Sequence, residues 1–352
     1  LCDIAQRHLE DSILCVKNFC KENYFISKII ENYKKTGSPI FINLDHNVSG
    51  KPLSDSTKIV SEMVEIVKAT AGSVLGYKMN FQSLLTFLIA KESEFVFRIK
   101  EVYKETCRDE FGTSVEPVVW LDQKLGDIPS TNFQVADILF ELGFDALHVL
   151  PHIGPDSVGA VHLAAKDRKV GVIHVVNMTH DGYNFVKKEL LRDDAIHKMR
   201  EIAIGYSYPV KIADQEVNVK IKAVGTIEPA TRPYELYNGY KEYGKKLLIF
   251  SIGIGAQGAL PGTALYAGAT FEGIGRFIYL HKGELDTVKN IKDKTKVCEY
   301  CSLISLLARY SREPYPLDEI ITILNNYNPK IPAKIADDLA KIYELRKREK
   351  LI

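Results

Sequence analysis

Residues 118–131 read VVWLDQKLGDIPST and combine a short apolar run with the start of a helix. The run Val118–Leu121 is too short for a helix and predicts a buried β-strand, and Pro129 suits the first turn of a following helix. Asp122 and Lys124 are two positions apart, so on a strand both point to the same side. Opposite charges on the inner side of a barrel are costly unless they pair. We interpret the stretch as a strand–turn–helix unit with a polar site at the end of its strand.

Seven further apolar runs of similar length occur along the chain. Most are bounded by Gly, Pro, Asn or Asp, and segments with helical spacing lie between them. The runs are Ile40–Leu44, Val74–Met79, Ala146–Leu150, Val170–Met178, Val217–Val224, Leu247–Ile252 and Phe271–Ile274, and the helical segments include Thr57–Lys68, Asn132–Leu142 and Pro233–Tyr243. Eight strands that alternate with helices over about 240 residues predict an α/β fold, a (β/α)8 TIM barrel. A doubly wound open sheet is the competing interpretation.

The two ends of the chain differ from this repeat. Residues 1–36 predict one or two helices with a charged face, and residues 286–352 are Lys-rich, helical and interrupted by prolines. We therefore predict a barrel domain at 37–285 with helical N- and C-terminal extensions. The connection 182–218 is long for a barrel loop, which is typical of a lid or a binding loop.

The composition excludes several classes of protein. Of 352 residues, 46 are Lys or Arg and 45 are Asp or Glu, and a net charge of +1 is too small for nucleic-acid binding by bulk electrostatics. Hydrophobic residues make up 46%, enough for a core, but no run approaches the ~20 apolar residues of a membrane span. Six cysteines are too few for a disulfide scaffold, and the first residues do not resemble a signal peptide. We expect a soluble cytoplasmic enzyme that binds neither nucleic acid nor membrane.

Polar side chains follow the predicted strands at the end where barrel enzymes carry their sites. They are Asp45, Lys78, Asp122, Lys124, Thr179, Gln257 and Arg276. A lone charge in such a position is usually a solvated loop residue, but this set brings opposite charges together on one rim. Asp127 and Thr131 lie four apart on the opening turn of the next helix, where an ion pair that caps the helix is the alternative explanation. The sequence therefore predicts a charged active site.

A glycine-rich loop follows the seventh predicted strand. It contains a G-x-G-x-x-G pattern at Gly253, Gly255 and Gly258. A dinucleotide site needs this pattern after the first strand of a βαβ unit, so we discount that interpretation. Barrels often hold a phosphate between the loops after strands seven and eight, where glycines allow close backbone approach and Arg276 adds a planar cation. A phosphorylated small molecule is the ligand that this pattern predicts.

Two other patterns carry little weight. The C-x-x-C pair Cys298 and Cys301 has no second pair to complete a zinc site and fits one turn of a helix. The histidines at 148, 152, 162, 174 and 180 match no metal-binding spacing, and core or rim positions explain most of them. His180 follows Thr179 at a strand end and is a weaker candidate for the site. We predict no metal site.

The motif Asp122-x-Lys124-x-x-Asp127-Ile128-Pro129-x-Thr131 resembles the signature of orotidine 5'-phosphate decarboxylase, in the form of its archaeal branch. Other segments are similar to the same family in the same order, over residues 39–281. They are Pro155-Asp156-Ser157-Val158, Met178-Thr179-His180, Ala230-Thr231-Arg232-Pro233, the loop Gly253–Gly258 and Gly275-Arg276-x-Ile278-Tyr279. The strand-three motif is specific, whereas the glycine loop alone is not.

The resemblance implies a homodimeric barrel that converts orotidine 5'-phosphate to UMP and carbon dioxide without a cofactor, the last step of de novo UMP biosynthesis. It also implies roles for individual residues. Lys78, Asp122, Lys124 and Asp127 would be catalytic, with Lys124 delivering the proton to C6 and Asp122 beside the substrate carboxylate. Asp45 would bind the ribose, and Thr179 would bind the pyrimidine. Gln257 and Arg276 would bind the phosphate, and Gly253, Gly255 and Gly258 would form the phosphate loop. Asp127, Ile128 and Thr131 would reach into the partner's site.

Two departures and two rival functions accompany the resemblance. Ile252 replaces a proline of the family's phosphate loop, and Thr179 replaces a serine but keeps the hydroxyl. The first rival is a magnesium-dependent relative, 3-keto-gulonate-6-phosphate decarboxylase or hexulose-phosphate synthase, which shares D-x-K-x-x-D. The Ile128-Pro129-x-Thr131 segment and Gln257 argue against it. The second rival is a non-catalytic nucleotide-binding protein, which an intact charged motif disfavours.

Overall fold

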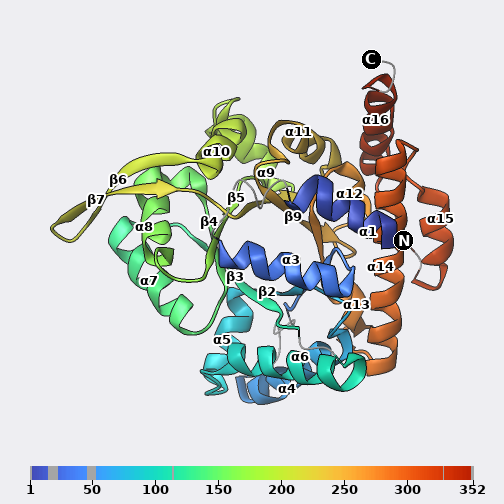
Figure 1. Ribbon diagram of the computed structural model, residues 1–352, viewed down its shortest axis with the longest axis horizontal. Helices are drawn as coiled ribbons and strands as arrows, with labels where there is room; N and C mark the ends of the chain where they lie inside the picture. Colours follow the sequence, from blue (N-terminus) through green and yellow to red (C-terminus); the bar gives the residue numbers. More distant parts are fainter. Residues whose placement is uncertain (1, 15–22, 46–52, 113–114, 328, 350–352) are drawn as a thin grey trace.

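The computed structural model describes residues 2–14, 23–45, 53–112, 115–327 and 329–349. Its centre is a closed barrel of eight parallel strands in the order β1-β10-β9-β8-β5-β4-β3-β2 (Figure 1). The strands are β1 (Ile40–Asn43), β2 (Gly76–Asn80), β3 (Val118–Leu125), β4 (Ala146–Val149), β5 (Gly171–Val175), β8 (Gly225–Pro229), β9 (Leu248–Ile254) and β10 (Phe271–Ile274). The predicted (β/α)8 barrel is confirmed, and the open sheet is excluded because β1 pairs with β10.

The prediction of the sixth barrel strand was wrong. The run Val217–Val224 falls mostly in β7 (Gln215–Ile221), which pairs antiparallel with β6 (Tyr206–Ile212) in a hairpin outside the barrel. The sixth barrel strand is β8, which pairs with β5 and β9. The alternating pattern of β7 reflects one exposed face, whereas a strand of a parallel barrel is buried on both faces.

The strand β8 was missed because it reads GTIEP and lacks an apolar run. Its Glu228 is buried, and the carboxylate pairs with Arg200 at 2.8 Å from Nε to Oε1. Arg200 lies on α10 (Ala195–Ile204), within the long connection that the sequence analysis assigned to a lid or binding loop. That connection also contains α9 (Gly182–Phe185), a π-helical turn (Val186–Leu190) and the β6–β7 hairpin, which packs on α7 and α8.

Helices surround the barrel and bury one face each against it. They are α4 (Ser56–Thr70), α5 (Phe81–Ile89), α6 (Phe95–Phe111), α7 (Pro129–Glu141), α8 (Pro155–Ala165), α11 (Pro233–Tyr243), α12 (Thr263–Ala267) and α13 (Arg276–Tyr279). In α4, for example, Ile59, Val60, Met63 and Val67 are buried at intervals of three and four. The core therefore lies between the strands and this helical ring.

The N-terminal helices cover the amino-terminal end of the barrel. They are α1 (Cys2–His8), continued by a π-helical segment (Leu9–Leu14), and α3 (Tyr24–Thr36), which crosses the barrel in Figure 1. Phe25 of α3 packs edge-on against Trp120, with ring centroids 6.3 Å apart, and Lys28 bonds to Glu116 and Asp145. This end is thereby closed, so the opposite end remains for a site.

The C-terminal helices line one side of the barrel (Figure 1). They are α14 (Val288–Ser311), α15 (Leu317–Ile323) and α16 (Ala333–Glu349), and a 3-10 turn (Asn325–Tyr327) follows α15. The long α14 packs on α4, α12 and α13, and α16 packs on α11 and α12. Cys298 and Cys301 are buried on α14, one helical turn apart. In the described part of the chain, no helix combines the length and apolarity needed to cross a bilayer.

A buried carboxyl group joins the barrel to α14. Glu272 of β10 accepts hydrogen bonds at Oε1 from the backbone N–H of Gly262, at 2.6 Å, and from the hydroxyl of Ser302 on α14. Burial raises the pKa of Glu272 to about 7, although these hydrogen bonds favour the ionised form. Folded Glu272 therefore holds a proton at pH values where the unfolded carboxyl has lost it.

This difference predicts a pH-dependent loss of stability. Between about pH 5 and 7 unfolding releases a proton from Glu272, so the free energy of unfolding falls as pH rises, by about 1.4 kcal/mol per unit. Relative to Glu272→Gln, the wild type should lose stability across this range in urea unfolding measured at pH 5, 6 and 7. The exposed Glu65→Gln is the control. A difference in stability between wild type and Glu272→Gln that stays constant with pH would contradict the assignment.

Candidate active site

A polar pocket of about 330 Å³ opens at the carboxyl-terminal end of the barrel. It is lined from β1, β2, β3, β4, β5, β8 and β9 and from residues that follow β1, β5, β9 and β10. Eight residues that the sequence analysis selected line this one pocket: Asp45, Lys78, Asp122, Lys124, Thr179, Gly253, Gln257 and Arg276. They lie together because parallel strands of a barrel end at the same rim.

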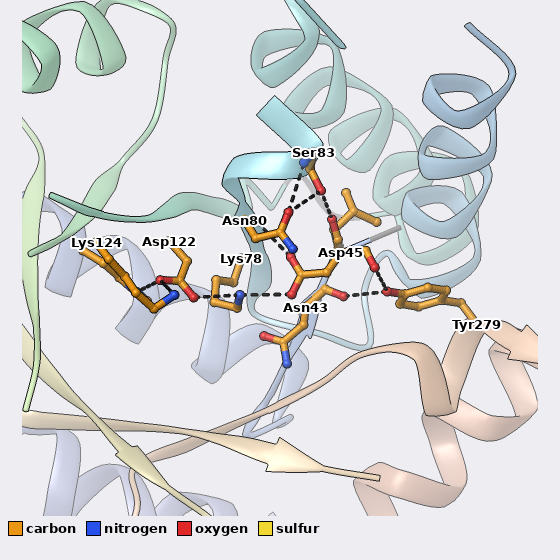
Figure 2. Close-up of polar contacts among 10 residues, drawn as sticks. Asn43, Asp45, Lys78, Asn80, Ser83, Asp122, Lys124 and Tyr279 are labelled. Carbon is orange, nitrogen blue, oxygen red and sulfur yellow. Dashed lines mark hydrogen bonds and ion pairs between the residues drawn. The ribbon is translucent and has the colours of Figure 1, made fainter. Parts of the chain in front are cut away.

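Four of these side chains form a continuous chain of opposite charges (Figure 2). The Nζ atom of Lys78 lies 3.1 Å from Oδ2 of Asp45 and 3.3 Å from Oδ2 of Asp122. The Nζ atom of Lys124 lies 2.6 Å from Oδ1 of Asp122. Lys78 and Asp122 are buried, whereas the side chain of Lys124 is 40% exposed. Lys124 is therefore the cation of the network that a bound molecule reaches first.

The network keeps its two buried members, Lys78 and Asp122, ionised. Burial alone would raise the pKa of Asp122, but Lys78, His148 and Lys124 hold that pKa well below its ordinary value. Burial would likewise lower the pKa of Lys78, yet Asp45 and Asp122 raise it. At neutral pH the pocket thus holds fixed, paired charges in a place of low water access, where electrostatic effects on a ligand are strong.

The backbone is irregular at Asp122 and Lys124, which are neighbours in this network. The register between β3 and β4 shifts between Leu121 and Leu125, the stretch that carries Asp122 and Lys124. Lys124 itself has φ 52°, a left-handed conformation that costs a non-glycine residue of order 1 kcal/mol and is found preferentially at functional sites. The irregularity turns both side chains into the pocket.

The end of β1 and Asp45 are held by hydrogen bonds from Asn80 and Tyr279. Oδ1 of Asp45 accepts a hydrogen bond of 2.9 Å from the backbone N–H of Asn80. The hydroxyl of Tyr279 donates to the backbone carbonyls of Asn43 and Asp45, at 3.0 and 3.1 Å (Figure 2). Asn80 also caps α5 by accepting from the N–H of Ser83. Asp45 is therefore fixed before any ligand binds.

The glycine loop contributes to the opposite wall of the pocket. Gly253 lines the pocket with φ 109°, and a Cβ there would meet Thr231 Cγ2 at 3.1 Å. Gly255 and Gly258 also have positive φ but do not line the pocket, and their N–H groups donate within the loop, to Ala259 and Gly255. Exposed Gln257 and Arg276 are thus the side chains that this wall offers to an anion.

Besides Gly255 and Gly258, three further predicted site residues lie outside the pocket of their own chain. Asp127, Ile128 and Thr131 are at the start of α7, on the outer surface. The carboxylate of Asp127 accepts from the N–H of Ile128 at 2.7 Å, and Ile128 is 62% exposed. The structure of one chain does not bring them to Lys124.

The sequence analysis missed His148 as a site residue. It lies on β4 and is fully buried, and its Nδ1 is 2.9 Å from Oδ1 of Asp122. Burial lowers the pKa of His148 although Asp122 opposes this, so the neutral ring donates Nδ1–H to the carboxylate. Its Nε2 has no hydrogen-bond partner within the described residues. The signal available in the sequence was a polar residue inside the apolar run of a predicted strand. This signal was overlooked because the histidines were compared only with metal-binding spacings.

Comparison with known proteins was made on sequence and on structure. The model of the orotidine 5'-phosphate decarboxylase / HUMPS family matches residues 39–291. The orotidine 5'-phosphate decarboxylase of Methanosarcina acetivorans is 30% identical over 206 residues, 57% of this chain and 84% of that protein. The protein of the same name from Pyrococcus furiosus is 31% identical over 176 residues, 50% and 71% of the respective chains.

Solved structures resemble the fold. A putative orotidine-monophosphate decarboxylase from Toxoplasma gondii has a TM-score of 0.61 at 18% identity and covers 81% of this chain and 98% of its own. Orotidine 5'-monophosphate decarboxylase from Methanocaldococcus jannaschii, complexed with the inhibitor BMP, has a TM-score of 0.51 at 22% identity and covers 74% and 97%. At these identities the likeness concerns the barrel and not its chemistry.

The contact between His148 and Asp122 leads to a prediction. His148→Leu removes a hydrogen bond to the ionised carboxylate, so the pKa of Asp122 should rise while the two lysines still keep it below its ordinary value. Carbon-13 NMR titration of labelled aspartate carboxyls measures this shift. His180→Leu is the matched control, because His180 lines the same pocket without a hydrogen bond to Asp122. An unchanged pKa in His148→Leu would refute the role of the contact.

Proposed function

The chain belongs to the orotidine 5'-phosphate decarboxylase / HUMPS family, and from this premise we propose that it decarboxylates orotidine 5'-phosphate to UMP and carbon dioxide, the last step of de novo UMP biosynthesis. The similar relatives bear the name of this enzyme. The observation that carries the proposal is the chain of charges from Asp45 through Lys78 and Asp122 to Lys124. It matches what this reaction demands of a protein.

The demand is electrostatic. Loss of carbon dioxide from C6 leaves an electron pair that the pyrimidine ring delocalises poorly, so fixed charges must stabilise the transition state. Lys124 is accessible from the pocket and held by Asp122 at 2.6 Å, and we assign its ammonium group to attract that electron pair and then protonate C6. Asp122, ionised beside the substrate carboxylate, would repel it, and departure of carbon dioxide relieves the repulsion.

The rest of the pocket binds the parts of the substrate that do not react. We assign Asp45 and Lys78 to the ribose hydroxyls, Thr179 to the pyrimidine, and Gln257 and Arg276 to the phosphate. Gly253 leaves room for a ligand at the same wall. Binding energy gained at the phosphate is available to position C6 against Lys124. Ile252, which lines the pocket in place of the family's proline, keeps an apolar contact for the base.

A homodimer is part of the proposal, with Asp127, Ile128 and Thr131 entering the partner's pocket. Ile128 is 62% exposed, and further exposed apolar side chains occur on the adjacent helices α5, α6 and α7. These are Phe81, Leu85, Leu88, Ile89, Phe97 and Ile138. Such a cluster on one side of a barrel is typical of a protein interface.

The remaining elements of the proposal concern cofactor, compartment and chain organisation. We propose catalysis without a metal, because both carboxylates of the network pair with Lys78 where a magnesium site needs several free oxygen ligands. The free thiols Cys107, Cys298 and Cys301 suit the reducing cytoplasm. Residues 37–285 form the catalytic domain in this proposal, and 1–36 and 286–352 are its extensions.

The activity itself is tested by ultraviolet absorbance. Purified protein in the presence of a chelator should convert orotidine 5'-phosphate to UMP, and Lys124→Ala should lower kcat by at least about a thousandfold because it removes the charge at the reacting carbon. Lys58→Ala, at an exposed position, is the control. Activity abolished by the chelator would favour the magnesium-dependent relatives, and UMP binding without turnover would favour a nucleotide-binding protein.

The shared site is tested with mixed dimers. Asp127→Ala and Lys124→Ala chains, each almost inactive alone, should regain up to half of the wild-type activity per dimer when combined. One of the two sites then receives an intact Lys124 from one chain and an intact Asp127 from the other. Absence of any regain in verified heterodimers would count against entry of Asp127 into the partner's pocket.

A further inference from the structure

A second cavity lies between the barrel and the terminal helices, away from the active site. It has a volume of about 570 Å³ and is bounded by α1, α11, α14 and α16 and by the turn after α11. Seven of its lining side chains are Arg or Lys and three are Asp or Glu, and it shares no residue with the active-site pocket. In a chain with a net charge of +1, this is a marked concentration of positive charge.

Two buried guanidinium groups from different helices line this cavity. Arg309 of α14 is 5% exposed and Arg346 of α16 is 6% exposed. Nη1 of Arg309 donates to the carbonyls of Leu265 and Ala269, and Nη2 of Arg346 to that of Tyr266. Nη2 of Arg309 and Nη1 of Arg346 have no hydrogen-bond partner among the described residues.

The carboxylates of the cavity make their close contacts with other groups. Asp11 pairs with Arg7 at 3.6 Å, Glu349 with Lys241 at 2.7 Å, and Glu242 contacts His197. Within the described ranges, neither Arg309 nor Arg346 forms an ion pair with any carboxylate. Burial and the neighbouring charge of Arg309 lower the pKa of Arg346. Two like charges buried close together are unfavourable, and a bound anion would supply the ion pair that neither forms within the described residues.

Aromatic rings hold both guanidinium planes in position. The Cζ atom of Arg309 lies 4.5 Å from the centre of the Tyr240 ring, and that of Arg346 lies 4.6 Å from the centre of Tyr266 and 5.2 Å from that of Tyr237. A guanidinium held against ring faces presents its N–H edges in fixed directions, and this geometry suits the oxygen atoms of a phosphoryl group.

We propose that this cavity binds a small anion with two or more phosphoryl groups, held by Arg309 and Arg346 and reached at the rim by Lys245 and Arg312. The rim residues are exposed and lie on separate elements, which lets them contact phosphoryl groups beyond the first. The volume accommodates a ligand of nucleotide size. Because Arg309, Arg346 and Lys245 come from α14, α16 and the end of α11, the bound anion would link both C-terminal helices to the barrel.

Calorimetric titration with inorganic pyrophosphate tests this site, with Arg276→Met separating it from the active-site phosphate position. Pyrophosphate should bind wild type and Arg276→Met alike, while Arg346→Met weakens the affinity at least about tenfold and Lys245→Met weakens it less. Binding that is lost in Arg276→Met, or kept in full in both Arg346→Met and Lys245→Met, would overturn the proposal. So would the absence of any binding to wild type.

Thermal unfolding provides a second readout that does not depend on the titration. Without the anion, the Tm of Arg346→Met serves as the reference for that variant, because the substitution removes both a buried charge and the hydrogen bond to the Tyr266 carbonyl. Saturating pyrophosphate should raise the Tm of wild type and Arg276→Met but not of Arg346→Met. If Arg346→Met fails to fold, Lys245→Met and Arg312→Met at the rim decide, and an unchanged affinity in both would refute the site.

The length and type of the ligand follow from three further probes. Affinity should increase from phosphate to pyrophosphate to tripolyphosphate as the rim cations are engaged. Equal binding of tripolyphosphate and a nucleoside triphosphate assigns the site to the phosphoryl chain alone, whereas tighter binding of the nucleotide adds the nucleoside to the ligand. Binding that does not depend on the number of phosphoryl groups would contradict the role of the rim.

Discussion

The structure of the active site depends on one buried carboxylate. Asp122 lies at the end of β3 with little access to water, and an isolated charge there would be strongly disfavoured. Lys78 and Lys124 supply two positive charges beside this carboxylate, and His148 adds a neutral hydrogen-bond donor. Lys124 lies on β3 itself, while Lys78 and His148 come from the neighbouring strands β2 and β4, so the network exists only when these three strands are paired. The charges that the reaction needs are thereby arranged before the substrate binds. The free-energy cost of burying them is offset when the protein folds.

The two ends of the barrel strands have different roles. At the amino-terminal end, α3 covers the aromatic cluster around Trp120. At the carboxyl-terminal end, strand ends and loops form the charged pocket. The C-terminal helices pack on the side of the barrel, and through Ser302 they reach Glu272 on β10. These helices also create the cationic cavity, which a barrel without them would not contain.

Much of this was predictable from the sequence, for reasons that are visible in particular residues. Asp45, Lys78 and Asp122 follow apolar runs, and closure of a parallel barrel brings such positions together. The strand β8 was not predictable in this way, because Glu228 interrupts its apolar run. The ion-pair partner of Glu228 is Arg200, which lies on another element, α10. The closeness of Arg309 and Arg346 likewise depends on how α14 and α16 are placed in the fold, and no local sequence pattern determines this. The structure of one chain does not bring Asp127 to Lys124, so its place in the site rests on the homodimer that we propose.

The central claim is that this fixed array of charges removes the carboxylate and protonates C6. The most direct test is one reaction in deuterium oxide with orotidine 5'-phosphate that carries carbon-13 in its carboxylate, followed by NMR. The account predicts labelled carbon dioxide together with UMP that bears deuterium at C6, because the protonating group Lys124 exchanges with solvent. Label that stays on the pyrimidine after incubation with folded, UMP-binding protein, or UMP without deuterium at C6, would contradict it.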